Sequence, residues 1–426
     1  MYKRIVFVSV TLILYGVALT MNLRARESDP AGLHIELEGQ ISDARILNKE
    51  IYREDFVNRE SPGMISHVSS IAPLDNERLI AVWYSGSREG AKDVAIFMSI
   101  YDERTGLWSE PVKLVDRRIA SRELKRYVKK VGNPMLMRDA YGKIWLFYSS
   151  VIAGGWSGSS INYKTTTDGI RWTESKKLLL SPFFNLTHNI KNAGLILNDG
   201  TLVIPAYSEL FNKTSSLIWI DEKKNSVKIK KITGGTDIIQ PVLLPDGKDK
   251  ILMFFRNTQK GSKGEGFQRV NESLPFALRK FTLCTKGDRR FIPSMEFDLT
   301  DKKFSPVKYT ELPNPDSGFD MIRTEDGSII AIINNSFLNR ENLSLFISQD
   351  NGKSWRLIHV LEDLQGKEYS YPFITKSLKG LYHITYTYER KRIKHVMFNE
   401  IWLKKKTGGR NQKIEESSGA KKYRLP

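Results

Sequence analysis

A tight-turn signal between two apolar runs recurs six times in this sequence, and it constrains the fold more than any other feature. Each turn leads into a run rich in β-branched and aromatic residues, which favour strands. Asp-Gly and related pairs suit these turns because they accept the positive φ angles that hairpins require. The six turns are Asp75-Asn76-Glu77, Ala140-Tyr141-Gly142, Asn198-Asp199-Gly200, Pro245-Asp246-Gly247, Glu325-Asp326-Gly327 and Leu378-Lys379-Gly380. The repetition predicts one antiparallel unit that is used six times along the chain.

A second kind of turn lies between the repeated units. The segment from Ser348 to Trp355 matches the Asp-box pattern S-x-D-x-G-x-[ST]-W at every position, and Asp168 to Trp172 is a shortened copy. In this motif the Asp and Ser/Thr side chains hold a hairpin turn, while the Trp packs between neighbouring sheets. We therefore assign the motif a structural role and no part in catalysis.

Six small antiparallel units predict an all-β fold, a six-bladed β-propeller of four-stranded antiparallel blades. The long interval between Gly247 and Gly327 indicates an insertion, with an exposed loop over Gly261–Gly266. Long helical patterns are absent from the sequence, and we expect one short helix within Ser121–Lys130. The chain is thus predicted to be a single repeated architecture with one enlarged unit.

Composition excludes several classes of site. One cysteine, Cys284, permits neither an intrachain disulfide nor a cysteine-based metal site, and the six histidines lack the spacing of HExxH. We expect no metal and no cofactor. The formal net charge of +18 favours anionic partners. Acidic lipid and acidic polysaccharide are such partners, whereas nucleic acid is not expected because the sequence holds no nucleic-acid-binding motif.

The N-terminal residues are typical of a membrane-targeting segment. Lys3 and Arg4 precede an uncharged apolar run from Ile5 to Leu19, which has the length of a signal-peptide core. Extended to Leu23, the run is long enough for an uncleaved anchor. Both interpretations predict that the remainder is exported. We divide the chain into a targeting segment (1–26), a linker and lead-in (27–60), the propeller (61–403) and a basic flexible tail (404–426).

Polar residues are predicted to gather at one rim of the propeller. The innermost strand of each blade faces the central axis, and side chains two residues apart share a face of a strand. Counting back from each turn, and forward along the strand that leaves it, places eleven polar side chains on that rim. They are His67, Ser69, Asn133, Lys191, Gln240, Asp320, Tyr371, Glu209, Arg256, Asn335 and Tyr388. The loop Arg88–Asp93 should overhang them, so this rim is the candidate site.

The chain resembles the BNR/Asp-box sialidase (neuraminidase) superfamily, and more closely its bacterial sialidase-like BNR-repeat branch. The resemblance extends from about Ser66 to His395. It rests on short segments that occur in order at blade spacing: His67–Ser70, Ser87–Gly90 with Asp93–Ile96, Gly132–Pro134, Lys191-Asn192, Gln240-Pro241, Pro313–Pro315 with Ser317-Gly318 and Asp320, and Tyr369–Pro372.

The resemblance implies an exo-acting glycosidase that removes a terminal sialic acid or other acidic sugar, with an acidic glycan or glycoconjugate as its expected partner. Sialidases use a tyrosine nucleophile, one of the known exceptions among glycosidases. Tyr371 falls at the nucleophile position, Arg256 matches one of three carboxylate-binding arginines, and Asp93 is the candidate acid/base. Glu209 is a candidate partner for Tyr371. The expected substrate-binding residues are Arg88, Glu89, His67, Asn133, Lys191, Asn192, Gln240, Arg256 and Asp320.

The sequence also departs from the family pattern. The opening F/Y-R-I-P motif is absent, and His67 stands near the position of its arginine. The segment Ile238–Gln240 occupies the place of the glutamate that partners the nucleophile, and Gln240 cannot accept a proton. No third arginine can be assigned, because Arg323 is expected to point elsewhere. Lys191 and Arg88 are candidates for supplying positive charge in a different way.

Three functions therefore stay open at this stage. A retaining exo-glycosidase requires Tyr371 to lie within hydrogen-bond reach of a carboxylate, with Asp93 or Glu89 across a pocket. A glycan-binding propeller without catalysis would keep Arg256 but would have no base near Tyr371. A membrane-tethered envelope scaffold would have a filled rim and an apolar patch on a blade instead. The sequence does not determine the oligomeric state.

Overall fold

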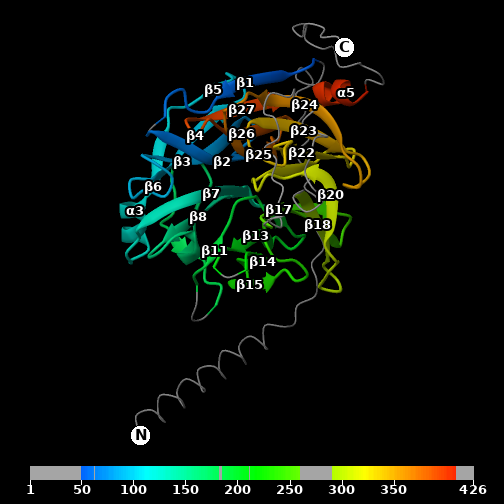
Figure 1. Ribbon diagram of the computed structural model, residues 1–426. Coiled ribbons are helices and arrows are strands. Elements are labelled where there is room, and N and C mark those ends of the chain that lie inside the picture. Colours follow the sequence, from blue (N-terminus) through cyan, green and yellow to red (C-terminus); the bar gives the residue numbers. More distant parts are fainter. Residues whose placement is uncertain (1–48, 62, 182–184, 211, 260–289, 409–426) are drawn as a thin grey trace, which may run out of the picture.

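In the computed structural model, six antiparallel sheets are arranged around a central axis as the blades of a propeller (Figure 1). The structure describes residues 49–61, 63–181, 185–210, 212–259 and 290–408. Each sheet has four or five strands, and apart from the outermost strand of the sixth blade these follow one another from the axis outward in chain order. One additional strand is paired off this path in three of the sheets. The predicted fold, a six-bladed all-β propeller, is confirmed.

The first three blades follow one another along the chain. Blade 1 contains β2 (Ile65–Pro73), β3 (Arg78–Gly86), β4 (Ala95–Asp102), β5 (Leu107–Trp108) and β6 (Val112–Asp116). Blade 2 contains β7 (Lys130–Arg138), β8 (Ile144–Val151), β9 (Ser159–Thr166) and β10 (Lys176–Lys177). Blade 3 contains β11 (His188–Asn189), β12 (Leu195–Ile196), β13 (Leu202–Ser208), β14 (Thr214–Asp221) and β15 (Ser226–Lys231).

The remaining blades complete the ring. Blade 4 contains β16 (Ile238–Asp246), β17 (Lys250–Asn257), β18 (Phe291–Asp298), β19 (Lys303–Phe304) and β20 (Lys308–Pro313). Blade 5 contains β21 (Asp320–Arg323), β22 (Ile329–Ile333), β23 (Asn342–Ser348) and β24 (Arg356–Asp363). Blade 6 contains β25 (Tyr369–Lys376), β26 (Tyr382–Tyr388), β27 (Arg392–Phe398) and β1 (Tyr52–Phe56).

The ring is closed by a strand from the N-terminal side of the chain. Strand β1 pairs with β27, from Tyr52 opposite Phe398 to Phe56 opposite Lys394, and so forms the outer edge of blade 6. It lies before residue 61, where the sequence analysis placed the start of the propeller. Closure of this kind pairs the outer edge of the last blade and joins the two ends of the domain by backbone hydrogen bonds.

The helices described by the structure are short. Helix α3 (Arg117–Glu123) follows blade 1, the 3₁₀ turn η1 (Trp156–Gly158) lies in blade 2, and α5 (Glu400–Gly408) follows β27. The single helix expected within Ser121–Lys130 thus begins four residues earlier, where the Asp116 carboxylate accepts hydrogen bonds from the backbone N–H groups of Arg118 and Ile119. Helix α5 extends into the segment predicted as a tail.

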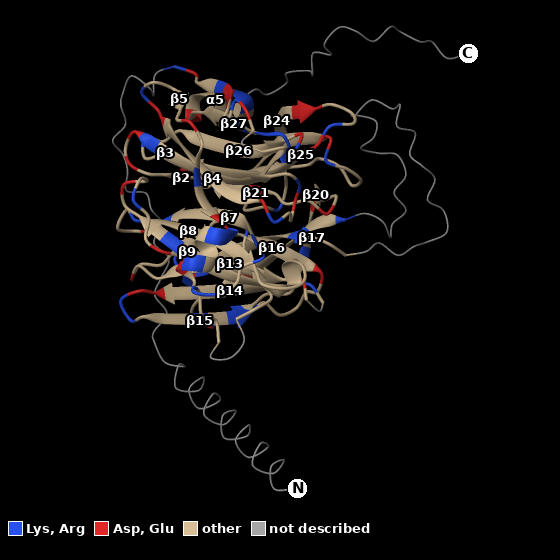
Figure 2. Cartoon of the chain, turned by 90° about the vertical axis from the view of Figure 1, so that its left-hand side faces the viewer, with Lys and Arg blue, Asp and Glu red and all other residues tan. Residues whose placement is uncertain are grey.

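Apolar layers between neighbouring blades form the core. One cluster joins blades 1, 2, 3 and 6, with Trp83 and Phe147 fully buried within it. Another joins blades 5 and 6. Burial of each large apolar side chain in these layers stabilises the folded state by about 1.5–3 kcal/mol. The apolar runs of the repeated strands thus supply the packing between neighbouring blades. Figure 2 shows that many charged residues lie at strand ends and turns, away from these layers.

The Asp-box turn has the predicted structural role. Asp350 Oδ1 accepts hydrogen bonds from Ser348 Oγ and from the backbone N–H groups of Lys353 and Ser354. Gly352 supplies the positive φ of 85° that the turn requires. The Trp355 ring packs edge-on against Phe254 of blade 4, with centroids 6.0 Å apart. The motif thus fixes a turn and joins two blades.

Some predictions concern residues outside the described ones. These are the targeting segment 1–26, the loop at Gly261–Gly266 and most of the tail. Within the described residues, no helix combines the length and apolar character needed to cross a membrane.

Candidate functional site

The candidate site is built on a backbone irregularity that four blades share. The innermost strands β2, β7, β16 and β25 each contain a register shift, at which one residue adopts a positive φ of 47–52°. These residues are Val68, Asn133, Gln240 and Tyr371. A bulge re-aims the side chain that it carries, and a non-glycine residue in this region costs about 1–3 kcal/mol. The fold thus turns four side chains in the same way near the axis.

Tyr371 lies at the centre of the polar cluster. Its hydroxyl oxygen accepts a hydrogen bond from Arg256 Nη1 at 3.3 Å. His67 packs edge-on against the Tyr371 ring, with centroids 5.0 Å apart, while His67 Nδ1 lies 3.0 Å from Thr387 Oγ1. Burial and the nearby arginines Arg390 and Arg340 hold the pKa of His67 well below its usual value. His67 is therefore uncharged, and its ring lines one side of the site.

Arg256 is held in place by groups on two other segments. Its Nε donates to Asp316 Oδ1 at 2.8 Å, and its Nη1 also donates to Gln240 Oε1 at 3.3 Å. Burial opposes the charge of Arg256, but Tyr371 and Asp316 more than offset this effect, so its pKa is raised. The guanidinium is a fixed cation beside the Tyr371 hydroxyl.

A second arginine lies beside Tyr371, and the sequence analysis did not find it. Arg340, in the loop after β22, has its guanidinium carbon 5.6 Å from the centroid of the Tyr371 ring. Arg340 Nη2 donates to the backbone oxygen of Asp316 at 2.8 Å, so Asp316 holds both arginines. Arg340 follows the second strand of its blade, as Arg256 ends the second strand of blade 4. This shared position is the signal that could have revealed it.

Further ion pairs connect this centre with the loop of blade 1. Glu368 lies 3.7 Å from Arg340 and accepts a hydrogen bond from Arg390 at 2.7 Å. Arg390 in turn donates to Glu89 at 2.9 Å. Arg390 and Glu368 were also missed by sequence reasoning. Glu89, predicted to bind substrate, is thus part of a charge network that joins blades 1, 5 and 6.

The side chains of Tyr371 and Gln240 both approach Gly318 closely. A Cβ atom on Gly318 would lie 2.8 Å from Tyr371 Cδ1 and 3.0 Å from Gln240 Oε1. Real Cβ atoms do not come as close as 2.8 Å to another heavy atom, so any larger residue would displace the tyrosine ring. Gly318 thus lets Tyr371 and Gln240 converge from blades 6 and 4.

Tyr207 joins the polar cluster from blade 3. Gln240 Nε2 donates to the Tyr207 hydroxyl at 3.3 Å, and Asn133 Nδ2 lies 3.5 Å from the same oxygen. Burial raises the pKa of Tyr207, and the charge of Glu209 adds to this shift. Asn133 and Gln240, both expected to bind substrate, are thus brought together around the Tyr207 hydroxyl. Glu209 acts electrostatically on Tyr207, and in the described structure its carboxylate makes no hydrogen bond to Tyr371.

Lys191, Asn192 and Asp320 lie deeper, where their side chains bond to the backbone. Lys191 Nζ donates to the carbonyl oxygens of Phe319 and Pro372, at 3.0 and 2.6 Å. Asn192 donates to the carbonyl oxygens of Gln240 and Pro241. Asp320 accepts from the backbone N–H groups of Met321 and Ile374. Burial lowers the pKa of Lys191 and raises that of Asp320. The three residues tie the innermost strands together beneath Tyr371.

Asp93 and Arg88 lie in the exposed loop after β3. Asp93 accepts hydrogen bonds from the backbone N–H and hydroxyl of Ser87, both at 2.9 Å. Slight burial raises the pKa of Asp93, but these bonds and the charge of Arg88 lower it further, so the net shift is downward. Arg323 points elsewhere, as expected, since it donates to the carbonyl oxygens of Pro245 and Gly327.

Comparison with protein families gives a direct assignment. The sequence profile described as "BNR repeat-like domain" matches residues 77–273 and 289–384, which is more than half of the chain. The chain belongs to this family. The predicted resemblance to BNR-repeat, sialidase-like proteins is confirmed. A search of curated proteins finds no match.

Solved structures of members of this fold share the propeller at low sequence identity. A Hadza microbial sialidase superposes with a TM-score of 0.63 at 13% identity, covering 82% of this chain and 68% of that chain. A protein of unknown function from Dyadobacter fermentans gives 0.59 at 12% identity, covering 82% and 99%. Trypanosoma rangeli sialidase in complex with sialic acid gives 0.56 at 12% identity, covering 84% and 58%. At these identities the likeness establishes the fold alone.

Proposed function

We propose that this BNR-repeat propeller is an exo-acting glycosidase that removes a terminal acidic sugar, such as sialic acid, from a glycan. One observation carries the proposal: the Tyr371 hydroxyl lies 3.3 Å from Arg256 Nη1, with Arg340 over the same ring. A neutral tyrosine is a suitable nucleophile beside a bound carboxylate, because a carboxylate nucleophile would be repelled. The sialidase structures with the same fold, one of them with sialic acid, support this choice of substrate.

The roles of the residues follow from their chemistry. Arg256 and Arg340 would bind the sugar carboxylate, and a charge-assisted bidentate bond of this kind contributes about 1.5–3 kcal/mol. The Tyr371 oxygen would attack the anomeric carbon as the bond to the glycan breaks, and Asp93 would protonate the departing oxygen. Water would then release the sugar from Tyr371. Glu209 would accept the phenolic proton through water in the bound complex, because the amides of Gln240 and Asn133 around Tyr207 cannot relay one. Asp93 would take the proton of the attacking water, and Tyr371 would recover its own from Glu209.

Turnover of aryl glycosides of acidic sugars tests the proposal. We expect the wild-type protein to release the aryl group from at least one of them, and Tyr371→Phe to abolish release because it removes the attacking oxygen. Tyr141→Phe is the matched control, since Tyr141 is exposed in a turn of blade 2. Unchanged turnover in Tyr371→Phe would contradict a mechanism in which Tyr371 is the nucleophile.

A second candidate, glycan binding without hydrolysis, is favoured by Gln240. This amide occupies the position where the family pattern places a glutamate, and it bonds to Arg256 and Tyr207. Among the described residues no carboxylate bonds to the Tyr371 hydroxyl. Under this alternative the wild-type protein binds an acidic monosaccharide without releasing product. Gln240→Glu supplies a carboxylate next to Arg256, so a gain of turnover in that variant would indicate a site that lacks only its base.

A further inference from the structure

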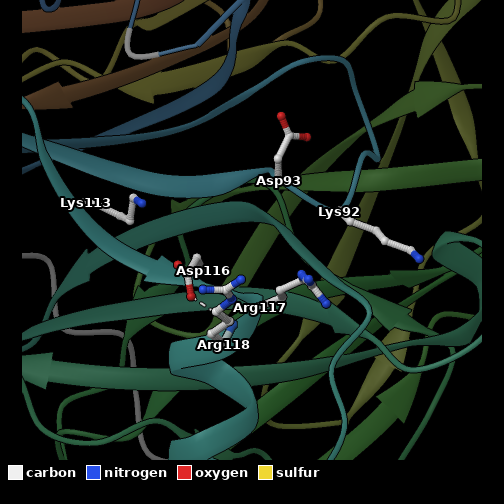
Figure 3. Close-up of a pocket in the computed structure, with 6 residues that line it drawn as sticks. All are labelled: Lys92, Asp93, Lys113, Asp116, Arg117 and Arg118. Carbon is white, nitrogen blue, oxygen red and sulfur yellow. Dashed lines mark hydrogen bonds between the residues drawn. The ribbon is translucent and has the colours of Figure 1, made fainter.

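A cleft lined by four basic and two acidic side chains lies on blade 1 and shares Asp93 with the proposed site (Figure 3). Its volume is about 340 Å³, which is within the range of small-ligand sites. The loop after β3, the strand β6 and the start of α3 form its walls. The lining residues are Lys92, Asp93, Lys113, Asp116, Arg117 and Arg118.

The two acidic groups of this cleft are already engaged, whereas the four basic groups are not. Asp116 accepts from two backbone N–H groups of α3, and Asp93 accepts from Ser87. Within the described part of the chain, the structure gives no ion pair to Lys92, Lys113, Arg117 or Arg118. Lys92, Lys113 and Arg118 are exposed to solvent. The cleft therefore presents unpaired cations to a ligand.

A second cleft continues from the first toward the rim. It has a volume of about 370 Å³ and shares Asp93 and Lys113 with the first cleft. Gly86 and Ser87 line it, where β3 leads into the loop that carries Glu89. Because Glu89 pairs with Arg390, this loop is tied to the charge network around Tyr371. The two clefts thus form one continuous groove that begins near the rim of the candidate site.

We propose that this groove, which we call the blade-1 groove, binds an anionic stretch of the glycan beyond its terminal sugar. The inference rests on the proposed function, since the terminal sugar must first be placed at Tyr371. The first cleft offers cations for carboxylate, sulfate or phosphate groups. The second adds the exposed Ser87 and Met64 for hydroxyl and apolar contacts.

The lining favours a glycan over single-stranded nucleic acid. Nucleic-acid channels combine cations with aromatic platforms on which successive bases stack. The first cleft has no aromatic lining residue, and the second has one, Phe97. Alternating charged and hydroxylated units of an acidic polysaccharide match a groove that combines cations with serine and backbone groups.

Binding of two sialic acid probes tests the proposal. Affinities for the monosaccharide and for a linear trimer with thioglycosidic linkages, which the enzyme cannot hydrolyse, are measured by calorimetry for the wild type and for Lys92→Glu/Arg118→Glu. Both positions are exposed, and a glutamate at the start of α3 interacts favourably with the helix, so folding should be retained. Lys228→Glu/Lys231→Glu, on the outer strand of blade 3, is the control with the same change of charge.

We expect the trimer to bind the wild type more tightly than the monosaccharide does. The groove variant should lose about tenfold in trimer affinity, with a weaker salt dependence, and about none in monosaccharide affinity. An equal loss of trimer affinity in the control variant, or equal wild-type affinities for both probes, would contradict glycan binding in the blade-1 groove. Trimer binding that depends on the groove without monosaccharide binding would instead overturn the proposed function. Tighter groove-dependent binding of a single-stranded oligonucleotide or of anionic vesicles would overturn the choice of partner.

Discussion

At the scale of single residues, the Tyr371 site is organised by groups that need not touch substrate themselves. Asp316 orients Arg256 through its carboxylate and Arg340 through its backbone carbonyl. Both bonds come from one loop residue with a φ of 57°, a conformation that costs free energy in a non-glycine residue. We infer that this cost is retained because it places two cations beside one tyrosine.

Gly318→Ala should impair the site without unfolding the protein. The added methyl group would lie 2.8 Å from the Tyr371 ring and 3.0 Å from Gln240 Oε1, so the ring must move. We expect affinity for an acidic monosaccharide, and any turnover, to fall at least about tenfold while the melting temperature changes by only a few degrees. Gly155→Ala is the control, because a Cβ there meets nothing within 4 Å. Equal effects of the two substitutions would show that Tyr371 does not need its present position.

At the scale of strands and turns, the sequence predicted the repeat well and the site in part. Hairpin turns and alternating apolar residues define blades because they are local signals. The bulges are not local: nothing in the letters of β2 distinguishes Val68, which adopts the positive φ, from His67, which the spacing selected. In blade 4 the pairing of β16 with β17 continues to Asp246 opposite Lys250, directly before the turn glycine. Fewer residues than in the other blades therefore separate that glycine from the bulge at Gln240, and a fixed count back from the turn does not reach the bulge. Counting along a strand also does not predict how deeply a side chain is buried. The spacing places Lys191 on the rim, but its side chain is buried and bonds to backbone carbonyl oxygens.

The Asp-box turn of blade 5 should contribute to stability and not to binding. The hydrogen bonds from Ser354 and Ser348, which outweigh a small effect of burial, lower the pKa of Asp350 to about 2. A lowered carboxyl pKa stabilises the fold above the unfolded value of 3.8, and this contribution is lost as the pH falls toward 2. Asp350→Ala should therefore lower the melting temperature at pH 7 by a few degrees, with a smaller difference from wild type near pH 3.

Thermal unfolding at the two pH values checks this expectation. Asp301→Ala is the matched control, because Asp301 is an exposed residue in the corresponding turn of blade 4 and its carboxylate holds no turn bond in the described structure. Affinity for an acidic monosaccharide should stay unchanged in both variants. A drop in affinity specific to Asp350→Ala would contradict a purely structural role for the motif.

At the scale of the whole molecule, a buried hydrogen-bond chain joins the first blade to the last. Trp108 Nε1 donates to His395 Nδ1 at 3.3 Å, and His395 Nε2 lies 3.0 Å from His383 Nδ1. Because the tryptophan can only donate, His395 must donate onward to His383, whose Nε2 then donates to Glu103 at 3.0 Å. Both ring nitrogens of His395 are thus bonded, and a second proton on His395 would point at the N–H of Trp108.

Mild acid should therefore weaken the closed ring through its buried histidines. Burial lowers the pKa of both His67 and His395, so the unfolded chain binds their protons near pH 6.5 while the folded chain does not. Each of these histidines then lowers stability as the pH drops below 6.5, by at most about 1.4 kcal/mol between pH 7.5 and 5.5. Asp320, whose pKa burial raises to about 6, acts in the opposite sense and offsets part of this loss. Urea unfolding at these two pH values should show a lower midpoint at 5.5, and burial lowers the pKa of His188 and His359 in the same direction. His67→Asn should reduce the difference because it removes one of these four histidines. An equal or higher midpoint at pH 5.5 would mean that one of these histidines gains a proton within the folded ring.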